Sequence, residues 1–103
     1  MKIFNPKTLQ TFAFSERQKN VFFQVDEFKM RIIELEKDQQ LPECEMNSYV
    51  IFSLVSGEVE VIVNNEKSVL TEGELLVSEP ATFSMKALRA SRLVGIQVAK
   101  EKL

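Results

Sequence analysis

The stretch that decides the fold is YVIFSLVSGEVEVIVNN, which runs from Tyr49 to Asn65. After Gly57, valines alternate with Glu58 and Glu60, the period-two pattern of a half-buried strand. We expect Gly57 to turn a hairpin between the strand before it and the strand after it. Asn64-Asn65 tolerates positive φ and predicts a second tight turn. This stretch therefore predicts a β-meander.

The same alternation marks further strands on both sides of this stretch. Val21–Asp26 and Arg92–Val98 alternate throughout, whereas Phe28–Glu36 changes parity after Ile32, which predicts a bulge. Ser15–Asn20 offers a helix N-cap but spans barely more than one turn, so we expect a turn there. Short strands with turn residues between them are typical of a sandwich or barrel. The predicted fold class is all-β.

Length and composition narrow the classes of protein to consider. A chain of 103 residues fits one hydrophobic core, so we expect residues 1–103 to form a single domain. The formal net charge of −2, with no basic block, argues against nucleic acid as a partner. Cys44, the single cysteine, excludes an intramolecular disulfide. No stretch is apolar enough for a signal peptide or a membrane span. These features predict a cytoplasmic protein with no membrane partner.

Two segments carry a resemblance to the cupin superfamily: residues 42–61, which contain Gly57, and residues 73–84, which begin Gly73-Glu74 and contain Pro80. In cupins the first motif brings two histidines and a glutamate onto a strand that ends in a glycine turn. The second motif runs from a Gly-Asp pair through a proline bend to a third histidine. The resemblance implies a cupin-type jelly-roll β-barrel, also called a double-stranded β-helix. It divides the chain into an N-terminal strand segment, 1–27, and a conserved barrel core, 28–99.

All four metal-ligand positions that the resemblance implies are substituted. Placing the cupin glycine on Gly57 puts the paired histidines at Cys44 and Met46 and the glutamate at Val50, and Gly73 places the third histidine at Ser84. The chain contains no histidine. A thiol, a thioether, a hydroxyl and a valine make a poor site for iron, manganese or zinc, and only the soft Cys–Met pair suits copper(I). We therefore expect no metal and no other cofactor.

Two other kinds of chemistry stay open. A register slip of one residue would turn Glu43 and Glu45 inward in place of Cys44 and Met46, as a carboxylate pair for acid–base work or a hard cation. Without the slip they are solvated residues at the barrel mouth, which the cost of burying carboxylates favours. A nucleophilic Cys44 would lack a histidine base.

Phenylalanine is concentrated near the N-terminus, where six of the eight lie in the first 28 residues. If residues 21–26 form a strand, adjacent Phe22 and Phe23 must point to opposite faces, so that the chain itself or a partner covers each face. Together with the cupin resemblance, this predicts a homodimer.

The candidate site is the barrel lumen, an apolar pouch lined by Cys44, Met46, Val50, Phe52 and Ser84. Such a pouch binds a small apolar molecule by shape and burial. The first hypothesis is therefore a metal-independent cupin-like module that binds or senses a small molecule and is not an enzyme. The second is a divergent cupin enzyme, of isomerase, lyase or oxygenase type, that uses Glu43, Glu45, Cys44 or Ser84. The third is a structural homodimer whose barrel is filled by its own side chains.

Overall fold

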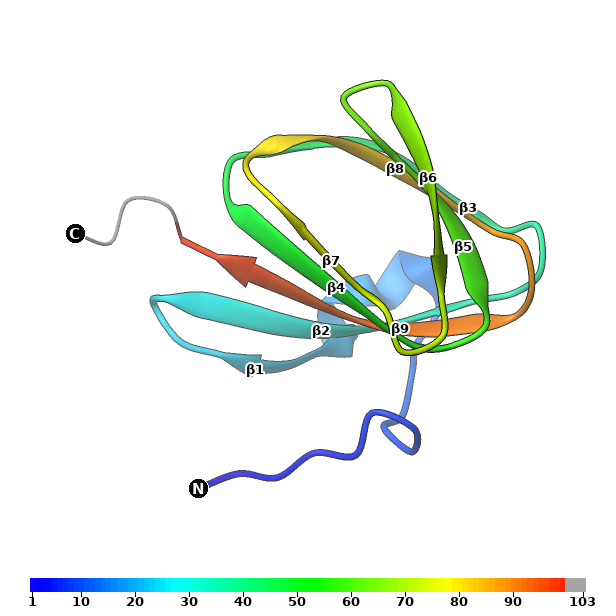
Figure 1. Cartoon of the computed structure of the whole chain (residues 1–103). Coiled ribbons are helices and arrows are strands. Elements are labelled where there is room, and N and C mark those ends of the chain that lie inside the picture. The colour runs from blue at the N-terminus through cyan, green and yellow to red at the C-terminus, as the bar shows by residue number, and fades with distance from the viewer. Residues whose placement is uncertain (100–103) are drawn as a thin grey trace.

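The computed structural model describes residues 1–99, whose strands form two antiparallel sheets that face each other (Figure 1). The five-stranded sheet has the order β1-β2-β9-β4-β7, and the four-stranded sheet has the order β3-β8-β5-β6. The strands within residues 1–99 are β1 (Val21–Gln24), β2 (Phe28–Leu35), β3 (Gln40–Met46), β4 (Tyr49–Ser56), β5 (Glu58–Val63), β6 (Glu66–Thr71), β7 (Leu75–Ser78), β8 (Ala81–Ala87) and β9 (Ser91–Val98). One short helix, η1 (Phe14–Asn20), precedes them. The prediction of an all-β fold is confirmed.

The hydrophobic core lies between the two sheets. Alternation along β4 points Val50, Phe52 and Leu54 inward, where they meet Val59 and Val61 of β5 from the opposite sheet. The rest of the buried core comes from Leu35, Leu70, Phe83, Met85, Ala87 and Leu93. The predicted inward positions of β4 therefore agree with the structure.

The predicted hairpin at Gly57 is wrong. β4 pairs with β7 and β9, while β5 pairs with β6 and β8, so Gly57 carries the chain from one sheet to the other. Gly57 has φ +95°, and a Cβ there would collide with the Ser91 hydroxyl and the Ala90 carbonyl oxygen. Alternation shows which side chains face inward, but it does not show which strand lies alongside. The second predicted turn is confirmed, because Asn64 and Asn65 have φ 48° and 68° and join β5 to β6 as a two-residue hairpin loop.

The bulge lies in β1 and not in β2 as the parity change had predicted. β2 pairs with β9 in unbroken register from Phe28 to Leu35, whereas the register of β1 on β2 shifts between Val21 and Phe23. The extra residue is Phe22. Both Phe22 and Phe23 contact the ring of Phe4, with centroid separations of 4.9 and 6.3 Å, so the expectation that they point to opposite faces is also wrong.

The segment expected to be a turn at residues 15–20 is the 3-10 helix η1, interrupted at Glu16. The buried Asn20 at its end fixes it to the preceding chain. Asn20 Oδ1 accepts a hydrogen bond from the Phe12 amide at 2.8 Å, and Asn20 Nδ2 donates to the Phe12 carbonyl at 3.1 Å. Within the expected N-terminal strand segment 1–27, β1 is the one strand in the structure.

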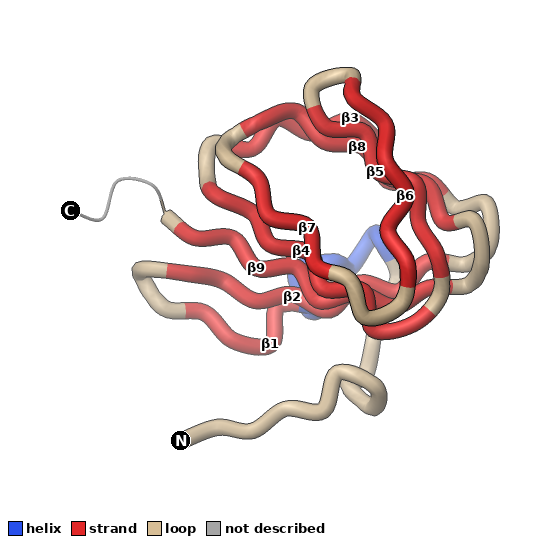
Figure 2. Tube along the Cα trace, viewed as in Figure 1, coloured by secondary structure: helices blue, strands red, loops and turns tan. Residues whose placement is uncertain are grey.

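The residues before η1 run as a loop along the outside of the five-stranded sheet (Figure 2). Arg92 of β9 anchors this loop, because its Nη1 donates to the carbonyl oxygens of Pro6 and Leu9 at 2.9 and 2.7 Å. Its Nη2 also pairs with Glu34 Oε2 at 2.7 Å. The loop therefore covers one part of the outer face of this sheet.

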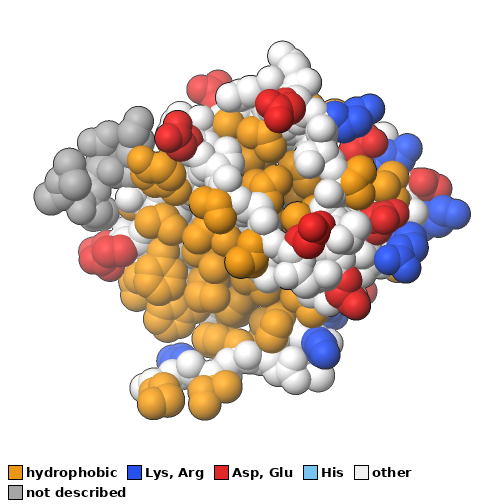
Figure 3. All heavy atoms as spheres, viewed as in Figure 1, with side chains coloured by type: hydrophobic (Ala, Val, Ile, Leu, Met, Phe, Trp, Pro, Cys, Tyr) orange, Lys and Arg blue, Asp and Glu red, His pale blue; other side chains and the backbone are white. Residues whose placement is uncertain are grey.

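The other part of this outer face is apolar, and no segment of residues 1–99 covers it. Figure 3 shows a broad hydrophobic surface over the five-stranded sheet, with charged side chains gathered elsewhere in the view. Leu75 and Val77 of β7 are 63% and 69% exposed, and Tyr49 of β4 is 40% exposed. Residues 1–99 contain no helix of the length and hydrophobicity that a membrane crossing requires.

Candidate ligand-binding cavity

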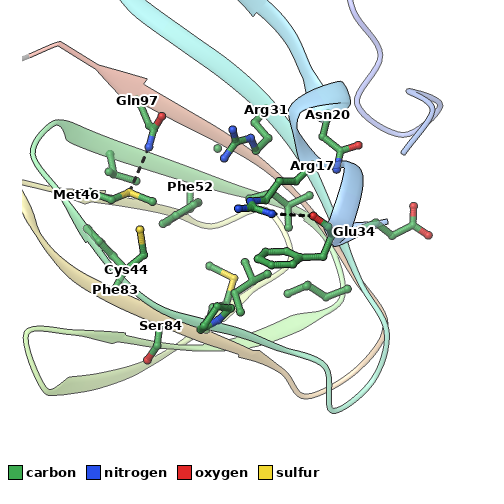
Figure 4. A pocket seen from close by; sticks show the side chains of 18 of the residues that line it. Arg17, Asn20, Arg31, Glu34, Cys44, Met46, Phe52, Phe83, Ser84 and Gln97 are labelled. Carbon is green, nitrogen blue, oxygen red and sulfur yellow. Dashed lines mark hydrogen bonds between the residues drawn. The ribbon is translucent and has the colours of Figure 1, made fainter. Parts of the chain in front are cut away.

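A cavity of about 310 Å³ lies between the sheets and opens toward η1 and β3 (Figure 4). Its apolar wall comes from both sheets and includes Ile33, Val50, Phe52, Phe83, Met85 and Met46. Phe52 and Phe83 meet edge to face at a centroid distance of 6.0 Å, which fixes the back of the cavity. This volume lies at the lower end of the range for small-molecule pockets in proteins.

Gly95 of β9 helps to keep this space open. It pairs with Phe52 on one side and Arg31 on the other, so its missing side chain would have pointed into the cavity. A Cβ at Gly95 would lie 3.3 Å from the Phe52 ring and 3.4 Å from Ile33 Cδ1. Any larger side chain at this position would occupy the cavity.

Basic side chains line the open side of the cavity. The register of β2 on β9 places Lys29 opposite Gln97 and Arg31 opposite Gly95, on the same face of the sheet as Phe52. Arg17 reaches the cavity from η1. Figure 4 shows the guanidinium groups of Arg17 and Arg31 directed into the space between the sheets. The lumen therefore has a basic mouth above an apolar floor.

Arg31 lacks a partner for its most buried donor. Its Nε is inaccessible to solvent and has no hydrogen-bond acceptor among residues 1–99. Burial lowers the pKa of Arg31, the positive charge of Arg17 lowers this pKa further, and Cys44 opposes the shift with a smaller effect. A buried unpaired donor is destabilising, so this guanidinium is costly for the folded protein as it stands.

Arg17 and Gln97 are held in place by local contacts. Arg17 Nη1 donates to the Phe14 carbonyl at 3.1 Å, and the guanidinium carbon lies 4.4 Å from the centre of the Phe14 ring. Gln97 Nε2 donates to the Met46 sulfur at 3.4 Å, a weak acceptor. Both side chains therefore keep donors that could turn to a bound molecule.

Four of the five predicted lumen residues lie together as expected. Cys44, Met46, Val50 and Phe52 all line the cavity, since Cys44 pairs with the inward-facing Phe83. Ser84 borders the cavity, but alternation along β8 turns Phe83 and Met85 inward and Ser84 outward. Its hydroxyl points away from the lumen in Figure 4. Whether these residues contact a ligand stays a prediction.

The two glutamates do not form an inward carboxylate pair. The pairing of β3 with β8 shifts between Leu41 and Cys44, which places a bulge at Pro42 and Glu43. Glu45 pairs with Thr82 and faces outward, and both Glu43 and Glu45 are exposed. The register that points Cys44 and Met46 inward is therefore the one the structure has.

The residues at the four cupin ligand positions do not fit a metal ion. Val50 offers no donor atom, Ser84 points away, and Cys44 and Met46 alone fall short of the three protein ligands that metal sites ordinarily need. Residues 1–99 contain no group of three or more histidine, cysteine, aspartate or glutamate side chains arranged to hold a metal.

Sequence reasoning missed the basic residues of the cavity. The sequence did contain a signal for Arg31. Ile33 and Leu35 were expected to share one face of their strand, and unbroken alternation places Lys29 and Arg31 on that same inward face. The predicted bulge in this strand concealed it. No pattern pointed to Arg17, because packing of η1 brings it to the cavity.

Comparisons with solved structures identify the fold. A conserved protein of unknown function from Streptococcus pyogenes matches with a TM-score of 0.73 and 18% identity, over 79% of this chain and 72% of that one. A cupin superfamily protein from Desulfitobacterium hafniense matches with a TM-score of 0.73 and 12% identity, over 78% and 74%. KdgF from Halomonas sp. matches with a TM-score of 0.71 and 15% identity, over 80% and 77%. No protein-family profile and no curated protein sequence matches the chain. The fold is the cupin jelly roll, as its motifs predicted.

Proposed function

From the premise of a cupin fold without the metal ligands of the cupin motifs, we propose that this chain binds a small organic molecule in its lumen, independently of metal. The observation that carries the proposal is the cavity of about 310 Å³ with its apolar wall and the polar groups at its open side. Pockets of this kind hold ligands by burial, and a small number of polar groups fix the orientation. A binding or sensing role follows from this proposal.

A ligand screen tests this function. We expect small organic molecules that fit the cavity to raise the melting temperature of the protein in a dose-dependent way. The matched control is Gly95→Val, which places a bulkier side chain in the cavity beside Phe52 without changing a charge. Ligands that stabilise the wild type but not Gly95→Val would support the proposal, and equal stabilisation of both proteins would overturn it. Elemental analysis of protein purified without chelator should show far less than one equivalent of transition metal.

The alternative of a divergent enzyme has less support. It relied on Glu43, Glu45, Cys44 or Ser84, of which the two carboxylates are exposed and Ser84 faces outward. Cys44 is at the cavity but has no histidine in the chain to act as its base. A screen for turnover is therefore a secondary experiment.

We propose in addition that two copies of the chain pair through the outer face of the five-stranded sheet. On β4 and β7, the part of this face that the N-terminal loop leaves open, the exposed residues are uncharged: Tyr49, Leu75 and Val77. In a two-fold dimer the same patch of both subunits meets at the interface. An apolar patch can pack against its own copy, whereas a patch of like charges would repel it. The patch therefore favours a second copy over a charged partner.

The oligomeric state is measured by light scattering after gel filtration. We expect a dimer for the wild type and a monomer for the double variant Leu75→Lys, Val77→Lys. Val69→Lys is the matched control, because Val69 is 48% exposed on β6 of the opposite sheet and should leave the dimer intact. A monomeric wild type would overturn this proposal without affecting the binding function.

A further inference from the structure

The charges around the cavity are unbalanced. Arg17, Lys29 and Arg31 line it, against two carboxylates, Glu34 and Glu43. Glu34 is already paired with Arg92 at 2.7 Å, and Glu43 is exposed in the bulge of β3. No ion pair joins either arginine of the cavity to a carboxylate within residues 1–99. The open side of the lumen therefore carries positive charge that the described chain does not neutralise.

Among these basic groups, Arg31 has a buried donor without a hydrogen-bond acceptor in the described chain. Its Nε is sealed from solvent without an acceptor, and Arg17 lies close enough to repel its charge. Two guanidinium groups directed into the same space repel each other unless an anion lies between them. The planar fork of arginine donors matches a carboxylate in particular, since two parallel hydrogen bonds can form.

The floor below these groups is apolar. Arg31 lies on the same sheet face as Phe52, separated from it by Gly95, so a molecule resting over Gly95 would meet the guanidinium and the aromatic ring together. An ion without an apolar body would leave this floor in contact with water. The cavity is thus built for a molecule with two unlike ends.

We infer that the lumen binds a small organic carboxylate whose apolar body packs on Phe52 and Phe83 and whose carboxylate pairs with Arg31 and Arg17. This inference rests on the proposed binding function and specifies the class of ligand. It differs from the apolar ligand that the sequence alone predicted, because the basic mouth was not foreseen.

Calorimetric titration with three probes tests it: benzoate, its neutral analogue benzamide, and inorganic phosphate. We expect benzoate to bind at least about tenfold more tightly than benzamide, because a charged hydrogen-bonded pair is stronger than a neutral one. Phosphate should bind more weakly than benzoate, since it cannot use the apolar floor. Arg31→Gln should reduce benzoate binding to the level of benzamide. Lys67→Gln, which removes one positive charge from the exposed surface of β6, should leave all three affinities unchanged.

The outcomes separate this inference from the function beneath it. Equal binding of benzoate and benzamide would show that the lumen does not recognise a carboxylate, and would leave it as a pocket for neutral molecules. Phosphate binding as tight as that of benzoate would show that the apolar body of the ligand does not contribute to binding, and would contradict the inference. Failure of every probe, together with no stabilisation in the ligand screen, would overturn both proposals. Undiminished benzoate binding by Arg31→Gln would overturn the role of Arg31.

A second variant distinguishes a binding role from a structural one. Arg31→Met keeps an unbranched side chain out to the position of Nε and removes the unpaired buried donor, so the ligand-free protein should melt at the same temperature as the wild type or higher. It should also lose the preference for benzoate over benzamide. A clear fall in melting temperature in the absence of ligand would make Arg31 a structural residue and contradict the inference.

Discussion

The two ends of the space between the sheets are packed in opposite ways. At one end, the side chains of Leu54, Val59, Val61, Ala87 and Leu93 are at most 1% exposed, and none of them borders the cavity. At the other end, Gly95 leaves room, Arg31 lacks a partner for a buried donor, and Cys44 is exposed. The first end will be called the filled end and the second the open end.

The filled end contributes most of the stability of this domain, whereas the open end lowers it. Aliphatic side chains in close contact supply the burial that stabilises a small domain. A cavity with unpaired basic groups does the opposite, and proteins keep such features at sites of function. Substitutions should therefore change folding at the filled end and binding at the open end.

The largest effect is expected at the filled end from Leu93→Ala. Leu93 is fully buried, so its truncation should lower the free energy of unfolding by about 2–5 kcal/mol through lost burial and a residual void. Urea denaturation followed by circular dichroism measures this loss. Met46→Ala, a change of similar size at the open end, should cost clearly less because Met46 is half-buried. An equal fall in the free energy of unfolding for Leu93→Ala and Met46→Ala would show that the two ends do not differ in packing.

The turn between the sheets should give the next largest effect. Gly57→Ala forces a side chain into a backbone with φ +95° and against Ser91, whose hydroxyl accepts from the Glu58 amide at 3.0 Å. We expect a loss of about 2–3 kcal/mol in the same denaturation experiment. Gly73 provides the contrast, since it has φ +85° but no atom within 4 Å of an added Cβ. Gly73→Ala should therefore cost less, and a reversed order would show that steric contact at Gly57 is unimportant.

Filling the open end should have a smaller effect on folding and a large one on binding. Gly95→Val places a Cβ 3.3 Å from the Phe52 ring and 3.4 Å from Ile33 Cδ1, so these side chains must shift slightly, and the variant should lose about 1 kcal/mol of stability. Benzoate binding, measured by calorimetry, should fall below detection. A variant that folds normally and binds benzoate as the wild type does would place the ligand elsewhere.

The smallest effect is a pH dependence at the β6–β7 turn, which lies against the filled end through the Leu54 backbone. The Thr71 hydroxyl and amide both donate to Glu74 Oε1 at 2.7 Å and lower the pKa of that carboxyl. Because the folded pKa lies below the unfolded one, this stabilisation is present above the unfolded pKa and is lost as pH falls through the folded pKa.

Thermal melts across the acid range test this linkage. Glu74→Gln should melt slightly below the wild type at neutral pH, and the two proteins should converge in acid. Glu72→Gln, a neighbouring exposed glutamate, serves as the control and should follow the wild type throughout. A difference between Glu74→Gln and wild type that stays constant with pH would contradict the lowered pKa.

The filled end could be predicted from the sequence because its pattern is local. The alternating Val59 and Val61 determine a strand face over a few residues, and the asparagine pair at the far end of the same strand determines a turn in the same local way. The pairing of β4 with β9 could not be predicted in this way, since the two strands are far apart in the chain. The hairpin wrongly expected at Gly57 came from treating neighbours in sequence as neighbours in the sheet.

The open end was predicted only in part. Cys44, Met46, Val50 and Phe52 follow from the alignment of motifs and from alternation, and they line the cavity. Ser84 turns outward because β8 alternates without a break, contrary to the position that the motif alignment gave it. Arg31 turns inward because β2 has no bulge in its pairing with β9. Of the basic mouth, Arg17 alone required the three-dimensional arrangement, because the packing of η1 brings it to the cavity.

We place the small organic molecule at the open end of the lumen, and not on the apolar outer face. The decisive experiment is a titration of isotope-labelled protein with benzoate, followed by NMR of the backbone amides and the arginine Nε–H groups. We expect saturable shifts at Arg31, Gly95 and Phe52, with the β5–β6 hairpin unchanged. Shifts confined to Tyr49, Leu75 and Val77 on the outer face, or no saturable shift at all, would contradict it.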